Sequence, residues 1–382
     1  MYLIRYPYGY LRSELMNKIR LIELFSGIGA QASALDRLGV NYESWITSEW
    51  EVNAVASYKA IHKPHDKTDY SKEYSIEEVT NYLVEVGIST DGKNPMTRQQ
   101  IERKNEKWRR TVYNNFMAIN NIGSIVNADA ADLEIYDTES YTYLLTYSFP
   151  CQDLSVAGKG AGMSKGSGTR SGLLWEIERL LNECTELPQI LLMENVPQVH
   201  GKNNIEDFNK WLEFLESKGY HNYWKDLNAK DYGVAQNRNR CFMISLLMNV
   251  PYHFPEPIPL TKRMKDYLED EVNEKYYINN EKADALIKKL IVNGELKSNK
   301  EPCDLTINDP STIETANCIK ARYDAGISNF KQDGSGVIET VGLKNKGTEF
   351  SKKIDVAHTL LARDYKGMAN TESNGVIECQ KK

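Results

Sequence analysis

Two residues in the chain have the type and the surroundings that covalent chemistry needs. Cys151 follows a proline in the run SFPCQD (148–153). A cysteine thiolate is a strong nucleophile once it is activated and held in place, whereas an unactivated cysteine there is only a small apolar side chain at a strand end. Glu194 ends an apolar run in MENVPQV. A buried carboxylate is costly unless it is paired or used, and burial favours its protonated form, which suits a general acid.

A pair of arginines follows later in the chain, in the run YGVAQNRNRCF. Arg238 and Arg240 stand two positions apart. On a strand they would point to the same face, so both guanidinium groups could meet one ligand or hold one carboxylate. The alternative is a pair of charges on the protein surface.

The run GKGAGMSKGSGTRSG (158–172) comes shortly after Cys151. It contains six glycines together with Lys159, Lys165 and Arg170. We expect it to pack no core and to close over a bound polyanion, because loops of this kind often cover a site. The alternative is a disordered surface loop.

A second group of residues has the pattern of a nucleoside site. FSGIGA (25–30) is a glycine-containing turn between a strand and a helix, but it lacks the third glycine of the dinucleotide-binding motif. Glu49, about 20 positions later, can hold ribose hydroxyls, and Trp50 can stack on a purine. Asp129 is expected to end a third strand, where it could accept a hydrogen bond from an adenine amino group.

These residues need elements that bring them together. Apolar runs of strand length alternate with helical spacing in the first 250 residues, which predicts a parallel sheet covered by helices. In such a sheet, ligands bind beyond the carboxyl ends of the strands. The expected strands and helices are 19–25, 30–38, 42–50, 51–62, 123–133, 143–152, 190–196 and 240–246.

The 382 residues are enough for one large domain and a smaller one. We expect an N-terminal extension (1–18), a catalytic domain (19–250) and, after a proline-rich linker, a second unit (251–382). The catalytic domain carries a polar insertion at about 62–112, which we expect to form solvated surface helices. The second unit contains an internal repeat, 316–339 and 357–378, whose copies share A-x4-A-R-x3-G and GVIE.

Composition narrows the class of protein. The net charge of −6 announces no nucleic-acid partner, although a local basic face would be enough to bind one. The six cysteines form no C-x-x-C pair, so we expect reduced thiols and no metal site. The chain begins with no signal peptide and has no apolar run long enough for a membrane span, so we expect a soluble, cytoplasmic protein.

Taken together, the motifs LIELFSGIGA, SFPCQDLSVAGKG, RSGLLWEI, MENV and LNAKDYGVAQNRNR resemble those of the DNA cytosine-5 methyltransferases. The resemblance covers roughly residues 19–247. It implies an α/β fold, with a Rossmann-like S-adenosylmethionine-dependent methyltransferase domain and a smaller, mostly β target-recognition domain. The implied cofactor is S-adenosylmethionine, and the implied partner is double-stranded DNA.

The resemblance also assigns roles to residues. Cys151 would attack C6 of cytosine, Glu194 would bind the ring N3 and the exocyclic amine, and Arg240, with Arg238 beside it, would hold O2. The target base would have to leave the duplex to reach Cys151. The cofactor would contact Phe25, Ser26, Gly27, Gly29, Glu49, Trp50, Asp129, Pro150 and Leu173. DNA would contact Gln152, Ser155, Lys159, Lys165, Arg170, Gln236, Arg322 and Arg363, the last two from equivalent places in the repeat.

Two family features are missing from this sequence. We find neither the R-x-L-T-P-R-E-like motif nor the final helix with an asparagine that completes the cofactor pocket. We therefore expect either a second polypeptide that supplies them or a truncated chain. Three other functions stay open: an RNA-directed relative, a non-catalytic DNA-binding relative and, least favoured, a nicotinamide oxidoreductase.

Overall fold

The computed structural model describes residues 18–154, 162–269, 277–278, 281–295, 300–318, 327–329, 332, 334–339 and 355–358. The chain divides into two compact units. Unit 1 comprises Met1–Asp226 and Arg240–Phe254, and unit 2 comprises Leu227–Asn239 and Pro255–Lys382. No helix in the described part of the chain has the length and the apolar character that a membrane crossing requires.

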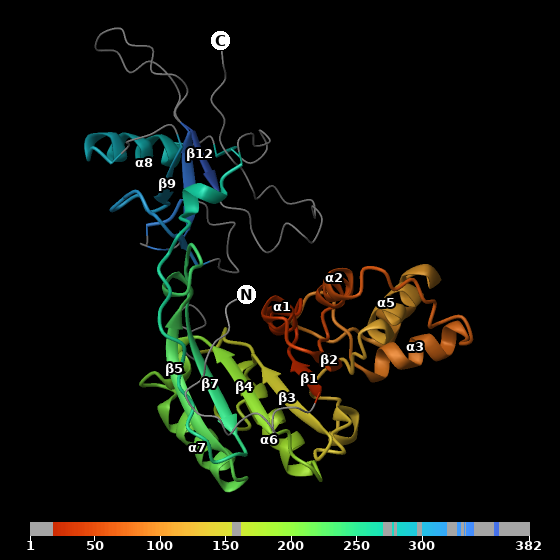
Figure 1. Ribbon diagram of the computed structural model, residues 1–382. Coiled ribbons are helices and arrows are strands. Elements are labelled where there is room, and N and C mark those ends of the chain that lie inside the picture. Colours follow the sequence, from red (N-terminus) through yellow and green to blue (C-terminus); the bar gives the residue numbers. More distant parts are fainter. Residues whose placement is uncertain are drawn as a thin grey trace. The chain divides into compact units, whose positions relative to one another are not determined.

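The centre of unit 1 is a six-stranded sheet with the order β2-β1-β3-β4-β7-β5 (Figure 1). The pairs β1–β2, β1–β3 and β3–β4 are parallel, and β7 runs antiparallel to β4. The amino-terminal end of β7 therefore lies at the carboxyl ends of its parallel neighbours. The strands are β1 (Lys18–Leu24), β2 (Tyr42–Ser48), β3 (Tyr141–Tyr147), β4 (Ile190–Asn195), β5 (His221–Asn228) and β7 (Asn239–Leu246).

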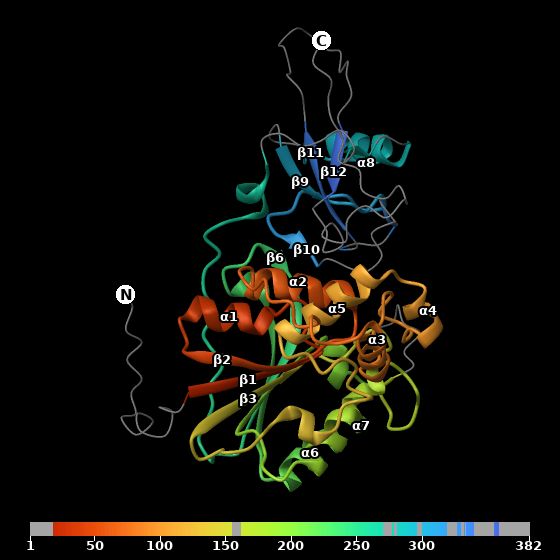
Figure 2. The ribbon, with the colours of Figure 1, turned by 90° about the vertical axis from the view of Figure 1, so that its right-hand side faces the viewer.

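Helices cover both faces of this sheet (Figure 2). Successive strand residues point to opposite faces, so Ile22 of β1 belongs to the core shared with α6 and α7, whereas Leu21 belongs to the core shared with α1, α2, α3 and α5. The helices are α1 (Ala30–Leu38), α2 (Val52–His62), α3 (Ile76–Glu85), α4 (Arg98–Glu102), α5 (Glu106–Ala118), α6 (Leu174–Glu183) and α7 (Ile205–Ser217). Short 3-10 helices are η1 (Ala130–Leu133), η3 (Ser171–Leu173), η4 (Pro197–His200), η5 (Ala229–Asp231) and η6 (Met264–Tyr267).

The polar segment at 62–112 is helical, but it also contributes to the core. Val79 and Leu83 of α3 are fully buried, as are Ile101 of α4 and Phe116 of α5, which ends just beyond the segment. Side-chain capping boxes start α3 at Ser75 and α4 at Thr97. The polar composition therefore belongs to the outer faces of helices whose inner faces share a core with α2, because an amphipathic helix needs only a stripe of apolar residues.

The expectation of a strand ending at Asp129 is wrong. Only Asn121 makes a bridge, to Thr47 at the edge of the sheet. The chain then passes through Gly123, whose φ is 77°, and turns where Asn127 N–H donates to the Ser124 carbonyl at 3.0 Å. A positive φ and a turn break the extended conformation that a strand needs.

Unit 2 is built from short strands and one long helix. β6 (Gln236–Asn237) pairs in parallel with β10 (Ala316–Asn317). A second sheet has the order β8-β12-β11-β9 and is antiparallel. Its strands are β8 (Tyr277–Ile278), β9 (Lys300–Asp304), β11 (Ser335–Glu339) and β12 (Asp355–His358), and α8 (Glu281–Val292) packs on its core through Leu286 and Leu290.

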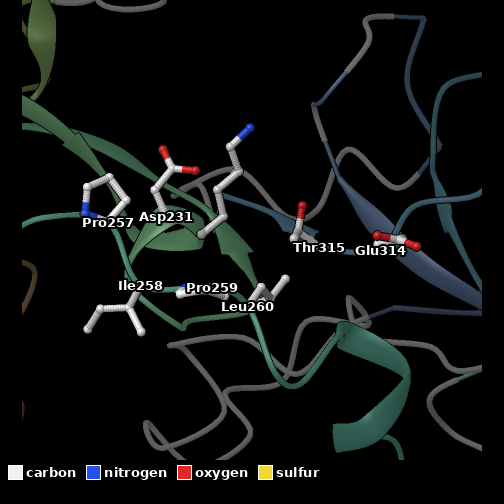
Figure 3. A pocket seen from close by; sticks show the side chains of 8 residues that line it. Asp231, Pro257, Ile258, Pro259, Leu260, Glu314 and Thr315 are labelled. Atoms are coloured by element: carbon white, nitrogen blue, oxygen red, sulfur yellow. The ribbon is translucent and has the colours of Figure 1, made fainter.

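The internal repeat lies only partly within the described residues. Its first copy contains β10 and β11, whereas the second copy is described only for two residues at the end of β12. Unit 2 also has an open hollow of about 570 Å³, lined by Lys230, Asp231, residues 257–260, Glu314 and Thr315 (Figure 3). Of the predicted DNA contacts that lie within the described ranges, none lines this hollow.

Candidate active site

The turn that follows β1 is shaped by its backbone. Gly27 and Gly29 have φ values of 55° and 81°, a region that L-residues with a Cβ rarely enter. Ser26 N–H donates to the Ser48 carbonyl at 3.1 Å, which ties the turn to the end of β2. A Cβ added at Gly29 would lie 2.3 Å from His62 Nε2, whereas one added at Gly27 would have no heavy atom within 4 Å. Gly29 is therefore required by close packing, and Gly27 leaves open space.

A buried hydrogen-bond network supports this turn. The Glu23 side chain, in a residue only 1% exposed, accepts from Tyr58 Oη at 2.5 Å and from the Ala32 N–H at 3.2 Å. His62 donates from Nε2 to the Ile28 carbonyl at 3.1 Å, and its ring lies 4.5 Å from that of Tyr58. Desolvation raises the pKa of Glu23 to about 7. The turn thus rests on titratable side chains that the sequence motif does not reveal.

Glu49, directly after β2, contacts the same turn from the neighbouring strand. Its carboxylate accepts from the Gly27 N–H at 3.1 Å and from the Glu51 N–H at 2.8 Å. Desolvation is the main cause that raises its pKa, opposed by these backbone donors. The Asn121 side chain holds the backbone of Glu49 on both sides, donating to its carbonyl at 3.0 Å and accepting from its N–H at 3.1 Å. Trp50, half-buried, follows directly.

Asp129 is placed differently from the expectation. It is the N-cap of η1, where Oδ1 accepts from the Ala131 N–H at 2.9 Å and from the Asp132 N–H at 3.4 Å. Its side chain therefore has a local structural task, the satisfaction of helix N-terminal donors. That task alone accounts for an aspartate at this position.

The turn that follows β3 carries Cys151, which is half-buried and unbridged. Asn195, at the end of the neighbouring strand β4, donates from Nδ2 to the Phe149 carbonyl at 3.0 Å. Ser171 of η3 donates from Oγ to the Pro150 carbonyl at 2.6 Å. The two carbonyls just before the cysteine are thus fixed from two different elements.

Asp153 fixes the other side of the cysteine. Its Oδ2 accepts from the backbone N–H groups of Arg170 at 2.8 Å and Ser171 at 3.3 Å, so it caps the start of η3. Arg170 Nη2 also lies 3.3 Å from Asp153 Oδ1. The Cys151 turn and η3, which includes Leu173, are therefore connected by hydrogen bonds and an ion pair.

Glu194 of β4 forms an ion pair with Arg240 of β7, the strand next to β4 on the side away from β3. Arg240 Nε lies 2.9 Å from Glu194 Oε1, and the two side chains are 16% and 21% exposed. The pair forms because β7 is antiparallel to β4, with Glu194 opposite Phe242. Glu194 lies near the end of β4, as expected, but it is only partly buried, with its side chain 21% exposed.

Arg238 does not share a strand with Arg240. It lies between β6 and β7 in unit 2, where its Nη1 donates to Cys318 Sγ at 3.6 Å. Gln236 belongs to β6 and pairs with Ala316. The same-face argument for the two arginines fails because the extended conformation breaks at Arg238.

The glycine-rich run belongs to unit 1, and one residue of its described part lies in the core of that unit. Met163 is fully buried in the core, and its carbonyl accepts from Trp175 Nε1 at 2.6 Å. The expectation that this run packs no core is wrong, because one methionine among the glycines reaches the core. Lys165 lies 2.7 Å from Glu178 on α6. Four predicted DNA contacts lie outside the described residues: Ser155, Lys159, Arg322 and Arg363.

Several residues of this edge were missed by sequence reasoning. Asp153, Asn195, His62 and Glu23 had no readable signal, because their hydrogen-bond partners lie far along the chain. At this edge, the described residues form three neighbouring groups: the glycine turn with Glu49, the turn that carries Cys151, and the ion pair of Glu194 with Arg240.

Comparison with known proteins shows the family to which the chain belongs. Residues 19–84 and 86–370 match the family model of the C-5 cytosine-specific DNA methylases. The chain is 43% identical over 267 residues to the orphan methyltransferase M.SssI of Spiroplasma monobiae, which covers 69% of this chain and 68% of that protein. It is 38% identical over 264 residues to the type II methyltransferase M2.ScrFI of Lactococcus lactis subsp. cremoris, covering 69% and 71%.

Among solved structures, the Entamoeba histolytica methyltransferase EhMeth aligns with a TM-score of 0.48 and 16% identity, covering 82% of this chain and 75% of that one. The sheet with helices on both faces is the Rossmann-like α/β fold of S-adenosylmethionine-dependent methyltransferases. The chain belongs to the family of C-5 cytosine-specific DNA methylases. It is a DNA methyltransferase, and its family implies S-adenosylmethionine as methyl donor and DNA as substrate.

Proposed function

We propose that unit 1 transfers a methyl group from S-adenosylmethionine to C5 of a cytosine extruded from duplex DNA, with Cys151 as the nucleophile. The observation that carries the proposal is the Glu194–Arg240 ion pair, at 2.9 Å, on the strand next to the Cys151 turn. Tyr147 of β3 is in register with Met193 of β4, so the two strands end side by side. A nucleophile and an acid held by neighbouring strand ends can act on one planar base.

The turn after β1 has the properties of a cofactor site. Gly27 leaves open space at a positive φ, and the Ser26 Oγ is buried without a hydrogen-bond partner. Glu49, fixed beside this turn, can accept from ribose hydroxyls. Phe25, Gly29, Trp50, Pro150 and Leu173 would complete the contacts. The bound cofactor supplies an electrophilic methyl group.

Each chemical step has a residue of suitable type. The Cys151 thiolate adds to C6, and Glu194 holds a proton at N3, so the electron pair of the C5–C6 double bond becomes available at C5. Arg240 keeps Glu194 oriented and can donate to O2 of the ring. C5 takes the methyl group and then loses its proton to a base. The thiolate leaves C6 as the double bond re-forms.

DNA binding would use cations that are paired in the free protein. Lys165 is paired with Glu178 and Arg170 with Asp153, so phosphates would have to replace these carboxylates. Gln152 is the neighbour of Cys151 and would contact the space left by the extruded base. Gln236 of unit 2 and the four residues outside the described ranges stay predictions for DNA contact, and Arg238 stays a prediction for contact with O2 of the target base. Asp129 remains a proposed adenine contact only if it gives up its cap.

Trapping of the reaction on modified DNA tests this function. In DNA that contains 5-fluorocytosine, C5 has no proton to lose, so the adduct with the enzyme cannot be released. With S-adenosylmethionine present, we expect a covalent complex that survives denaturation. Cys151→Ser should abolish it, and Glu194→Gln should slow its formation by about 100-fold or more. Cys184→Ser, which alters another half-buried thiol, is the matched control and should behave as wild type.

The alternatives give distinct outcomes in the same experiment. An adduct with RNA but none with DNA would establish the RNA-directed alternative. Cofactor binding without any adduct would establish a non-catalytic relative. The predicted second polypeptide is tested by adding a candidate partner chain: tighter cofactor binding by calorimetry and a faster adduct support it, and unchanged values exclude that partner.

A further inference from the structure

A cluster of three possible metal ligands lies in unit 1, and none of its three residues has a role in the proposed reaction. His200 ends η4, Asp226 lies in β5 and Cys241 lies in β7. The ligand atoms of the three side chains all lie within 4.8 Å of one another. His200 Nε2 is 2.9 Å from Asp226 Oδ1. Nitrogen, oxygen and sulfur donors therefore converge on one point.

The fold holds these donors from three separate elements. Cys241 is opposite Asn195 in the β4–β7 ladder, and β5 is the neighbour of β7 in the sheet. The His200 ring packs on Trp224, with ring centroids 4.7 Å apart, which limits its rotation. Because sheet pairing and ring packing fix the donors, a ligand would meet a preformed site rather than one assembled from mobile side chains.

The chemistry of the three groups suits a zinc-type cation. Zinc binds thiolate sulfur at about 2.3 Å and imidazole nitrogen or carboxylate oxygen at about 2.0–2.2 Å, which sets ligand atoms roughly 3–4 Å apart. The present spacing is close to that range. A thiolate and a carboxylate would balance the two charges of the cation, leaving the imidazole neutral.

Cys241 would change state when the cation binds. A dication favours the thiolate, because a coordinating thiol is deprotonated outright. The proton on the Cys241 sulfur would pass to solvent as the bond between sulfur and the cation forms.

We propose that His200, Asp226 and Cys241 bind one zinc-type divalent cation, with the fourth position open to water. The open position follows from the exposure of the donors: the Cys241 residue is fully buried, but the His200 and Asp226 side chains are 21% and 33% exposed. Three protein ligands with one open position are typical of exchangeable or reactive zinc sites, not of closed structural ones. Sequence reasoning missed the site because it searched for a C-x-x-C pair.

Cobalt(II) is the probe, because it replaces zinc and reports thiolate ligation by a charge-transfer absorption band. The full chain is stripped with a chelator and titrated with cobalt(II) under anaerobic conditions, followed by competition with zinc. We expect a thiolate band, displacement by zinc, and proton release on binding, measured from the buffer dependence of the binding heat. No methyltransferase activity is measured, so the outcome is independent of the proposed function.

Variants assign the band to the cluster. Cys241→Ala should remove it, and Asp226→Asn, which keeps the size and the hydrogen-bonding ability of a partly exposed side chain, should weaken binding at least about tenfold. Cys184→Ala is the control and should keep both the band and the affinity. A band that survives Cys241→Ala, or an affinity unchanged by Asp226→Asn, would overturn the proposal, as would the absence of any band in wild type.

Discussion

The turns after β1 and β3 leave neighbouring parallel strands at one edge of the unit 1 sheet, and different forces hold them. The first, residues 25–29, depends on glycine backbone conformations and on a buried network beneath it, which includes Glu23 and His62. The second, residues 148–154, depends on side chains of other elements, Asn195 and Ser171, that donate to its carbonyls. Backbone conformations that favour glycine shape the first turn, whereas side chains of two other elements hold the backbone carbonyls of the second.

This difference has consequences for how each turn responds to change. The first turn rests on Glu23, whose pKa is raised to about 7 by desolvation, so its stability should depend on pH near neutrality. The carbonyls of the second turn are held by an amide and a hydroxyl, which do not titrate in that range. A cofactor-side turn that is sensitive to pH and a nucleophile turn that is rigid would let binding of the cofactor change without misplacing Cys151.

The largest expected effect breaks the first turn. Gly29→Ala forces a positive φ on alanine and places its Cβ against His62 and Tyr58, so we expect the free energy of unfolding to fall by at least about 3 kcal/mol. Gly27→Ala has the same backbone cost but no clash, and should lose only about 1 kcal/mol. Urea unfolding without cofactor measures both. Tryptophan fluorescence reports unit 1, since all six tryptophans belong to it. Equal losses in the two variants would contradict the packing argument.

The next effect tests the titrating network. The pKa of Glu23 is about 7 in the folded protein and about 4.5 ordinarily, so the folded state binds the extra proton between these values. Its contribution is fully present below about pH 4.5 and is lost as the pH rises through about 7, a loss of about 3 kcal/mol. Glu23→Gln cannot titrate and should lack this slope. Urea midpoints between about pH 5 and about pH 8 give the comparison, and parallel curves for both proteins would refute it.

The smallest effect sharpens the second turn. Asp153→Ala removes the acceptor for two backbone N–H groups at the start of η3, and should cost about 1 kcal/mol. Adduct formation at Cys151 should slow while cofactor affinity stays unchanged, because the first turn is untouched. Asp153→Asn keeps an acceptor oxygen and should stay close to wild type. A loss as large in Asp153→Asn would assign the effect to the Arg170 ion pair instead.

Local elements of unit 1 were predictable because their signals are local. The strand before FSGIGA and the helix at 30–38 follow from apolar spacing and two glycines, and the structure confirms both. The strands that precede Glu49 and Cys151, and the strand that contains Glu194, were predicted for the same reason. A strand ending at Asp129 was also predicted, wrongly, because an apolar run of that length also suits a turn that is tied to a sheet edge.

Predictions failed where the outcome depended on distant partners. The polar insertion packs on α2 through α3 and α5, and Met163 enters the core from a run dominated by glycine. Composition averages over both faces of a helix and over a whole loop, so one buried side chain or one apolar stripe is lost in the average. The prediction that Arg238 and Arg240 share one strand failed for a similar reason. The pairing of β6 with β10 depends on residues about 80 positions later, and the run that contains the arginines gives no sign of it.

The sequence by itself determined the chemistry, since the types and order of Cys151, Glu194 and Arg240 with the FSGIGA turn are those of a cytosine-5 methyltransferase. Only the tertiary structure decided how these groups are held. The antiparallel course of β7 brings Arg240 to Glu194, and it also sets Cys241 close to Asp226 and His200. Pairing between strands acts across long separations in the chain, so the motif SFPCQD indicates the proposed nucleophile, Cys151, but not the contacts that hold it in place.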